Sequence, residues 1–123
     1  MAETYLWIAL GGALGSMARF WFSAAMTTLT GPAFPWGTLV INIVGSFAIG
    51  VLASFARTGA LPHIPQNVAA FAMVGICGGF TTFSSFSLQT LDLARGGKIV
   101  HASAYVLSSA VLCLTFVWIG TKL

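Results

Sequence analysis

Charged side chains are absent from two long stretches of this chain, and their absence constrains the fold more than any other feature. No Asp, Glu, Lys or Arg occurs between Arg19 and Arg57, or between Arg57 and Asp92. A helix needs about 20 apolar residues to cross a bilayer, so each stretch can contain a membrane span. Only 6% of the residues are charged and the mean hydropathy is +0.95, values typical of membrane proteins.

Turn-forming residues divide the chain into four predicted transmembrane helices, at about 5–27, 37–56, 68–91 and 99–121. The connecting segments TLTGPAFPW, RTGALPHIPQN and ARGGK contain all four prolines, and proline and glycine end helices. The first stretch lacks a basic leader and is too long for a signal peptide, so we expect it to be a true span. The sequence therefore predicts an all-α membrane protein, with residues 1–123 forming a single four-helix transmembrane domain in the lipid bilayer.

The basic residues predict no preferred orientation in the membrane. With both termini and the second loop on one side, that side holds Arg57 and Lys122, and the opposite side holds Arg95 and Lys98. Orientation is normally set by an excess of Lys and Arg on the cytoplasmic side. The equal numbers of basic residues on the two sides are compatible with insertion in both orientations. They are equally compatible with short loops that simply carry few charges, in which case a translocation factor decides the orientation of the protein. Because four helices leave little room for a pathway, a transport function would arise more naturally between copies.

A stripe of small residues in the first predicted helix leads to an arginine. In GGALGSMAR, Gly11, Gly15 and Arg19 recur every four residues, a spacing that allows helix backbones to approach closely. An arginine at depth costs about 2.5 to 3.5 kcal/mol on insertion scales unless it snorkels or pairs. Arg19 is expected either to attract anions into a watery vestibule or to anchor the helix at the interface.

Two predicted helices carry a polar face within apolar sequence. In WGTLVINIVGS, Thr38, Asn42 and Ser46 recur every four residues and share one face. Asn42 must hydrogen-bond across helices or line water, because a free amide is unfavourable in lipid. The fourth helix has a second face of this kind, formed by Tyr105, Ser109 and Cys113.

The segment GICGGFTTFSSFS, residues 75–87, is predicted to break the third helix near its middle. Glycine is flexible, and Ser and Thr compete for backbone hydrogen bonds. Non-helical backbone at membrane depth is tolerated only where it is buried in protein or lines a cavity, and its carbonyls can bind a cation. Phe83 and Phe86 would share one face after the break, where they either pack or offer electropositive ring edges to a small anion.

Other chemistries have little support. Cys77 and Cys113 have no histidine at ligand spacing, so neither a disulfide nor a zinc site is expected. His63, in a loop, and His101, at a helix start, lack a nearby nucleophile or carboxylate, so no enzyme activity is expected. The few cations are dispersed, so nucleic-acid binding is not expected.

The motifs GGALGSMAR, WGTLVINIVGS and GGFTTFSSFS resemble, in this order, the Fluc fluoride channels, also called CrcB proteins. The resemblance covers all four predicted helices. It implies an antiparallel, dual-topology homodimer in the bacterial inner membrane, with two pores through which fluoride leaves the cytoplasm passively and selectively. It also implies a structural sodium ion at the dimer interface, bound by the backbone carbonyls of Gly78 and Thr81.

The resemblance further assigns a fluoride pathway to particular residues. It implies that the ring edges of Phe83 and Phe86 face fluoride, that Asn42 is the pore asparagine, and that Ser84 and Ser85 belong to its polar track. Polar residues of the first, second and fourth helices complete the expected pathway: Arg19, Thr38, Tyr105 and Ser109.

Two positions depart from the family pattern. Cys113 stands where relatives often have a hydroxyl, and Gln89 stands where many carry glutamate. Composition favours an anion over a cation, since no carboxylate lies deep in a span; only the resemblance indicates fluoride. The main alternative is a small multidrug transporter, which exchanges protons for cationic drugs and needs a membrane-embedded carboxylate that the first helix here lacks. A non-conducting assembly subunit would leave the hydroxyl cluster without a role.

Overall fold

The computed structural model describes residues 1–58 and 64–123, and every regular element in these ranges is helical. Helix α1 spans Ala2–Thr30 and ends at Gly31, whose φ of 79° is left-handed and whose amide donates to the carbonyl of Thr27. Helix α2 spans Trp36–Thr58. The expectation about His63 falls outside the described residues.

The third predicted span consists of consecutive short elements rather than one uniform helix. They are α3 (Gln66–Ala69), the π-helical η1 (Ala70–Cys77), α4 (Gly78–Phe80) and α5 (Phe83–Arg95). Helix α6 then spans Ile99–Gly120. The helix ends therefore lie within a few residues of the predicted bounds, while the third segment is interrupted between α4 and α5.

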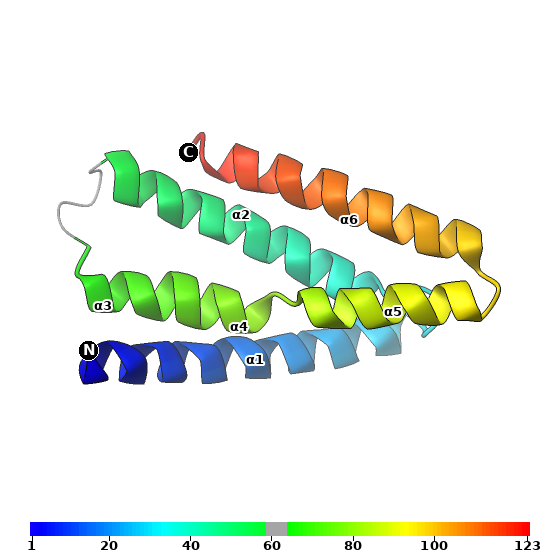
Figure 1. The fold of residues 1–123 in the computed structure, drawn as a ribbon, viewed down its shortest axis with the longest axis horizontal. Coiled ribbons are helices and arrows are strands. Elements are labelled where there is room, and N and C mark those ends of the chain that lie inside the picture. Colours follow the sequence, from blue (N-terminus) through cyan, green and yellow to red (C-terminus); the bar gives the residue numbers. More distant parts are fainter. Residues whose placement is uncertain (59–63) are drawn as a thin grey trace.

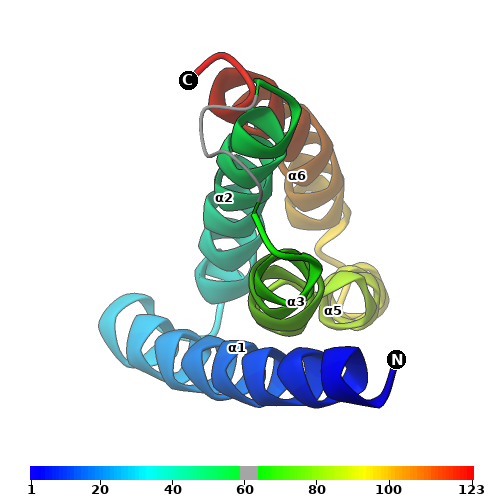
Figure 2. The ribbon, with the colours of Figure 1, turned by 90° about the vertical axis from the view of Figure 1, so that its left-hand side faces the viewer.

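The helices run roughly lengthwise and bring both termini to one end of the molecule (Figure 1). The end of α2 and the start of α3 lie at this same end, whereas the connections from α1 to α2 and from α5 to α6 lie at the other. Helix α2 packs most extensively on α6, and α1 packs on η1 and α4. Seen from the end, α3 and α5 lie side by side rather than on one axis (Figure 2). The interruption therefore displaces the two halves of the third segment.

Within residues 1–58 and 64–123, three segments are long and apolar enough to cross a membrane: Trp36–Thr58, Gln66–Arg95 and Ile99–Gly120. Helix α1 is 29 residues long but less apolar than α2 and α6, since it carries Arg19 and several small residues. Large apolar side chains point outward along its length, with Phe20 78% and Trp21 70% exposed. Such an outer surface suits lipid, because water would penalise so many exposed apolar side chains.

The glycines of the third segment serve close packing, a role that the sequence did not predict. Residues Gly78–Phe80 remain helical, and the extended backbone begins only at Thr81. A Cβ added at Gly75 would lie 2.8 Å from the Cα of Gly11, and one added at Gly79 would lie 2.6 Å from the carbonyl oxygen of Gly12. These glycines therefore let α1 approach the backbone of η1 and α4, and their weakening of the helix stays a prediction.

Candidate functional site

Two threonines separate α4 from α5. Thr81 (φ −80°, ψ 157°) and Thr82 (φ −153°, ψ 118°) both have extended backbone. Thr82 then caps α5, because its Oγ1 accepts a hydrogen bond from the amide of Ser85 at 3.1 Å. Threonine favours this cap position, where its hydroxyl satisfies an amide that has no partner within the helix. Thr81 therefore follows the end of α4, and Thr82 caps the start of α5.

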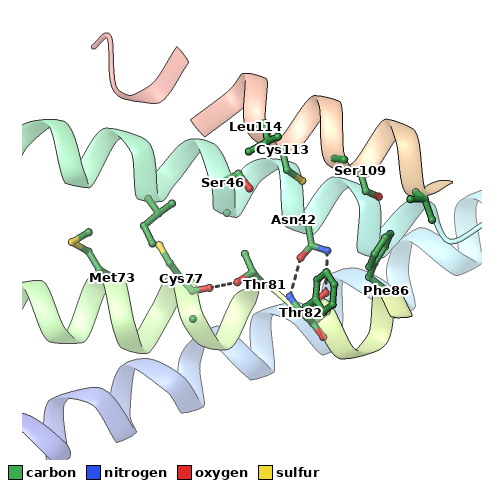
Figure 3. A pocket seen from close by; sticks show the side chains of 16 residues that line it. Asn42, Ser46, Met73, Cys77, Thr81, Thr82, Phe86, Ser109, Cys113 and Leu114 are labelled. Carbon is green, nitrogen blue, oxygen red and sulfur yellow. Dashed lines mark hydrogen bonds between the residues drawn. The ribbon is translucent and has the colours of Figure 1, made fainter. Parts of the chain in front are cut away.

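Asn42 of α2 holds the interrupted segment by a pair of hydrogen bonds (Figure 3). Its Nδ2 donates to the carbonyl of Thr82 at 3.1 Å, and its Oδ1 accepts from the amide of Thr82 at 2.8 Å. This pairing resembles the contact between neighbouring β-strands. It supplies the cross-helix partner that an amide inside a span requires.

The carbonyls of Gly78 and Thr81 are among those that lose their usual helical donors at the interruption. In an uninterrupted α-helix the amide of Thr82 would donate to the carbonyl of Gly78, but it donates to Asn42 instead. The amide of Ser85 would likewise donate to the carbonyl of Thr81, but it donates to the side chain of Thr82. Oxygen atoms of this kind suit a hard cation such as sodium. The residues predicted to bind sodium therefore fit such an ion, and the sodium site stays a prediction.

The next carbonyl, that of Gly79, has donors from a different helix. Nε of Arg19 donates to it at 3.0 Å, and Oγ of Ser16 lies 3.5 Å from it. Arg19 is half-buried and therefore turns part of its side chain inward toward the interruption. Both α1 and α2 thus contact the backbone around the two threonines.

A cavity of about 640 Å³ lies beside the interruption, between α2, α6 and the third segment (Figure 3). Its walls are mostly apolar, with a few hydroxyl, amide and thiol groups. The rings of Phe83 and Phe86 border it with centroids 5.4 Å apart, and Phe86 also lies 5.0 Å from the ring of Tyr105. Phe83 is 78% exposed, so one ring at this cavity is left uncovered by the chain itself.

Ser109 has an unsatisfied hydroxyl at this cavity. Its Oγ is buried and has no hydrogen-bond partner within the described part of the chain. Buried polar groups nearly always have a partner, so this hydroxyl is an exception beside the cavity that Ser109 lines. Cys113, one turn further along α6, borders the same cavity and is not in a disulfide.

A second cavity, of about 460 Å³, is distinctly more polar. It is lined by Ser16, Arg19, Phe20, Ser23, Thr38, Thr82, Ser85 and Gln89. Gln89 accepts a hydrogen bond from the hydroxyl of the fully buried Tyr105 at 2.9 Å. Thr82 borders both cavities, so the interruption lies between them.

The structure distributes the residues of the predicted pathway over both cavities. Asn42, Phe83, Phe86 and Ser109 border the first, while Arg19, Thr38 and Ser85 border the second. Ser84 is exposed and lines neither, although its Oγ lies 3.3 Å from Oγ1 of Thr82. Tyr105 also lines neither and reaches the second cavity only through Gln89.

Sequence reasoning missed Thr82, the residue common to both cavities. A signal was present, because a threonine directly before an apolar helical run is a typical cap residue. Gln89 was noted only as a departure from the family pattern, and its hydrogen bond to Tyr105 gives it a definite position.

Comparisons with known proteins agree on one family. A sequence model of the family described as "CrcB-like protein, Camphor Resistance (CrcB)" matches residues 6–121. A protein of Rhodospirillum rubrum named "Fluoride-specific ion channel FluC" is 53% identical over 95% of this chain and 91% of its own length. Proteins with the same name from Methylocella silvestris and Opitutus terrae are 48% and 52% identical, each over 94% of this chain and 88% of the relative.

Proposed function

The chain belongs to the CrcB family, and from this premise we propose that it is a passive, fluoride-selective ion channel that exports fluoride from the cytoplasm. The observation that carries the proposal is that Thr82 lines both cavities, whose other polar residues come from several different helices. No Asp or Glu appears among the described residues that line either cavity, whereas hydroxyls, an amide and aromatic rings do.

Fluoride is small and tightly hydrated, so a pathway must replace its water with several hydrogen-bond donors. The unpartnered hydroxyl of Ser109 is one candidate, and the second N–H of Asn42 Nδ2 is another. The electropositive ring edges of Phe83 and Phe86 would add weaker contacts. Ser85, Thr38 and the other polar residues of the second cavity would receive the ion beyond Thr82.

We also propose that the functional unit is an antiparallel, dual-topology homodimer in the bacterial inner membrane, with two pores. Support comes from the surface that a single chain leaves uncovered, since both Phe83 and Gly78 are exposed beside the larger cavity. The equal division of basic residues between the two sides removes a charge bias against insertion in both orientations. Labelling of Lys122 from both sides of intact membranes tests this; labelling from one side only would contradict it.

In such a dimer, the carbonyls of Gly78 and Thr81 from both copies would hold a structural sodium ion at the interface. The support is that the amides of Thr82 and Ser85, which would normally satisfy these carbonyls, donate elsewhere. Unpaired carbonyls inside a membrane cost several kcal/mol each, by order of magnitude, so a bound cation would stabilise the interruption.

Nothing favours the multidrug-transporter alternative. The acidic residue nearest to the first span is Glu3, which lies in the first turn of α1 and accepts a hydrogen bond from Asn67 at 2.9 Å. A carboxylate at a helix end is poorly placed to carry protons through the membrane centre.

The experiment that tests the proposed function is fluoride efflux from liposomes containing the purified protein, with chloride efflux as the control. We expect fluoride to leave much faster than chloride, and empty liposomes to release neither. Equal efflux of both halides would contradict fluoride selectivity, and absence of fluoride efflux would contradict a channel.

A further inference from the structure

We propose that Arg19 is a positioning residue, which holds the interrupted third segment in place through the carbonyl of Gly79. Its main role is then to supply a hydrogen-bond donor at a defined point, and attraction of anions by its charge is secondary. The transport readout of this inference rests on the proposed function, while its structural readout is independent of transport.

The carbonyl of Gly79 needs a donor because the chain leaves the helix directly after α4. In an uninterrupted α-helix, the amide of Phe83 would donate to it. Phe83 is instead the first residue of α5, beyond two residues with extended backbone. Nε of Arg19 takes the place of that amide, at 3.0 Å from the carbonyl oxygen.

Close packing of α1 on α4 brings Arg19 to this carbonyl. A Cβ on Gly79 would lie 2.6 Å from the carbonyl oxygen of Gly12, so no side chain fits between the two backbones here. Ser16, one turn before Arg19 and 3.5 Å from the same oxygen, faces the same point. The positive charge of Arg19 also interacts favourably with the C-terminal end of α4, where the helix dipole is negative.

The position of Gly79 matters because of its neighbours. Thr82, three residues further on, lines both cavities, and Asn42 holds it from α2. Arg19 and Asn42 therefore hold the interruption from two different helices. Without the contact from α1, the segment between Gly79 and Thr82 would be anchored on one side only.

Two substitutions separate the donor from the charge. In Arg19→Gln, the side-chain Nε2 occupies the same place along the chain as Nε of arginine, so the donor is kept and the charge is lost. In Arg19→Lys, a methylene occupies that place and the N–H donors lie one atom further along the side chain, so the charge is kept and the donor is displaced. Arg57→Gln and Arg57→Lys are matched controls, because Arg57 is exposed at the end of α2, away from both cavities.

We expect Arg19→Gln to lower fluoride efflux about threefold and Arg19→Lys to lower it about tenfold, because lysine no longer places an N–H at the position that faces the carbonyl of Gly79. Hydrogen–deuterium exchange of the peptide covering residues 78–86 should be faster in Arg19→Lys than in Arg19→Gln. Size-exclusion chromatography should give the same assembly for both, and the Arg57 variants should match the unsubstituted protein in every measurement.

The opposite order, with efflux kept by lysine and lost with glutamine, would overturn the inference in favour of a charge role. Equal efflux and equal exchange in the two Arg19 variants would also overturn it. If the unsubstituted protein carried no fluoride, the proposed function would fail, and the exchange rates alone would decide whether Arg19 holds the segment.

Discussion

The side chain of Asn42 bonds to both backbone groups of Thr82, with distances of 3.1 Å from Nδ2 to the carbonyl oxygen and 2.8 Å from the amide nitrogen to Oδ1. The pairing links α2 to the one stretch of extended backbone between α4 and α5. A residue expected from its position to line a pore therefore also maintains the shape of the third segment.

Replacing Asn42 by leucine should destabilise the protein while keeping its volume. Two hydrogen bonds are lost and two backbone groups of Thr82 lose a partner, which together cost about 2 to 4 kcal/mol of the free energy of unfolding. The measurement is thermal or denaturant unfolding in detergent. Ser46→Ala, one turn along the same helix, is the control and should change stability by less than about 0.5 kcal/mol. Similar losses in the two variants would show that the Asn42 pairing contributes little.

Replacing Gly45 by alanine should displace Thr81. An added Cβ at Gly45 would overlap Cγ2 of Thr81, so one of the two must move. Forcing extra volume into a packed contact costs about 1 to 3 kcal/mol, and fluoride efflux should fall as well. Gly12→Ala is the control, because no atom lies within 4 Å of its added Cβ, and alanine favours the helix by up to about 1 kcal/mol. Equal stability of the two variants would show that the close contact between Gly45 and Thr81 is not needed.

Replacing Phe83 or Phe86 by isoleucine should reduce fluoride efflux in both cases but reduce stability in only one. Isoleucine keeps apolar bulk and removes the electropositive ring edge. Phe83 is 78% exposed in the single chain, so its replacement should leave the packing within one chain nearly unchanged, whereas Phe86 packs between Phe83 and Tyr105. Efflux and unfolding measured on the same preparations separate the two effects. Unchanged efflux in both variants would assign the rings to packing alone.

The two cysteines should differ in their reactivity toward a thiol reagent and in the effect of that modification on fluoride efflux. Both border the cavity that Asn42 and Ser109 also line, but Cys77 is 6% exposed and Cys113 is more accessible. A small thiol reagent such as a methanethiosulfonate should therefore modify Cys113 first and lower fluoride efflux. Cys113→Ser should be insensitive to the reagent, and Cys77→Ser should remain sensitive. Inhibition that persists in Cys113→Ser would exclude Cys113 from the pathway.

Helix number and approximate helix ends were predictable from the sequence, because charge-free stretches and proline-containing connections mark membrane spans strongly. The family was predictable from the resemblance of three motifs. The location of the interruption was less predictable. Gly75 and Gly79 were expected to weaken the helix, yet they contact α1, and only the tertiary arrangement shows that role. A glycine has the same flexibility in both situations, so sequence alone does not distinguish them.

The candidate site was also predictable only in part. Side chains such as Asn42 and Arg19 were identifiable because a polar group inside a span needs a partner. Their partners, the backbones of Thr82 and Gly79, could not be identified, because every residue carries the same carbonyl and amide. Which backbone groups are free depends on where the helix is interrupted, and that depends on packing between α1, α2 and the third segment.

The proposed sodium site gives a last prediction, which depends on backbone rather than side-chain oxygens. Oγ1 of Thr81 donates to the carbonyl of Cys77 at 2.8 Å, so the side chain is directed back to η1 and the Thr81 carbonyl is the proposed ligand. Thr81→Ser keeps the hydroxyl and Thr81→Val removes it, and both should leave sodium dependence unchanged. Replacing sodium by N-methylglucamine, which is too large for a site made of backbone carbonyls, should weaken the dimer and lower its unfolding temperature in all three proteins. Dimer stability measured against sodium concentration checks this, with chloride held constant. Loss of sodium dependence in Thr81→Val alone would indicate that the hydroxyl binds the ion, and dimers equally stable without sodium would remove the site altogether.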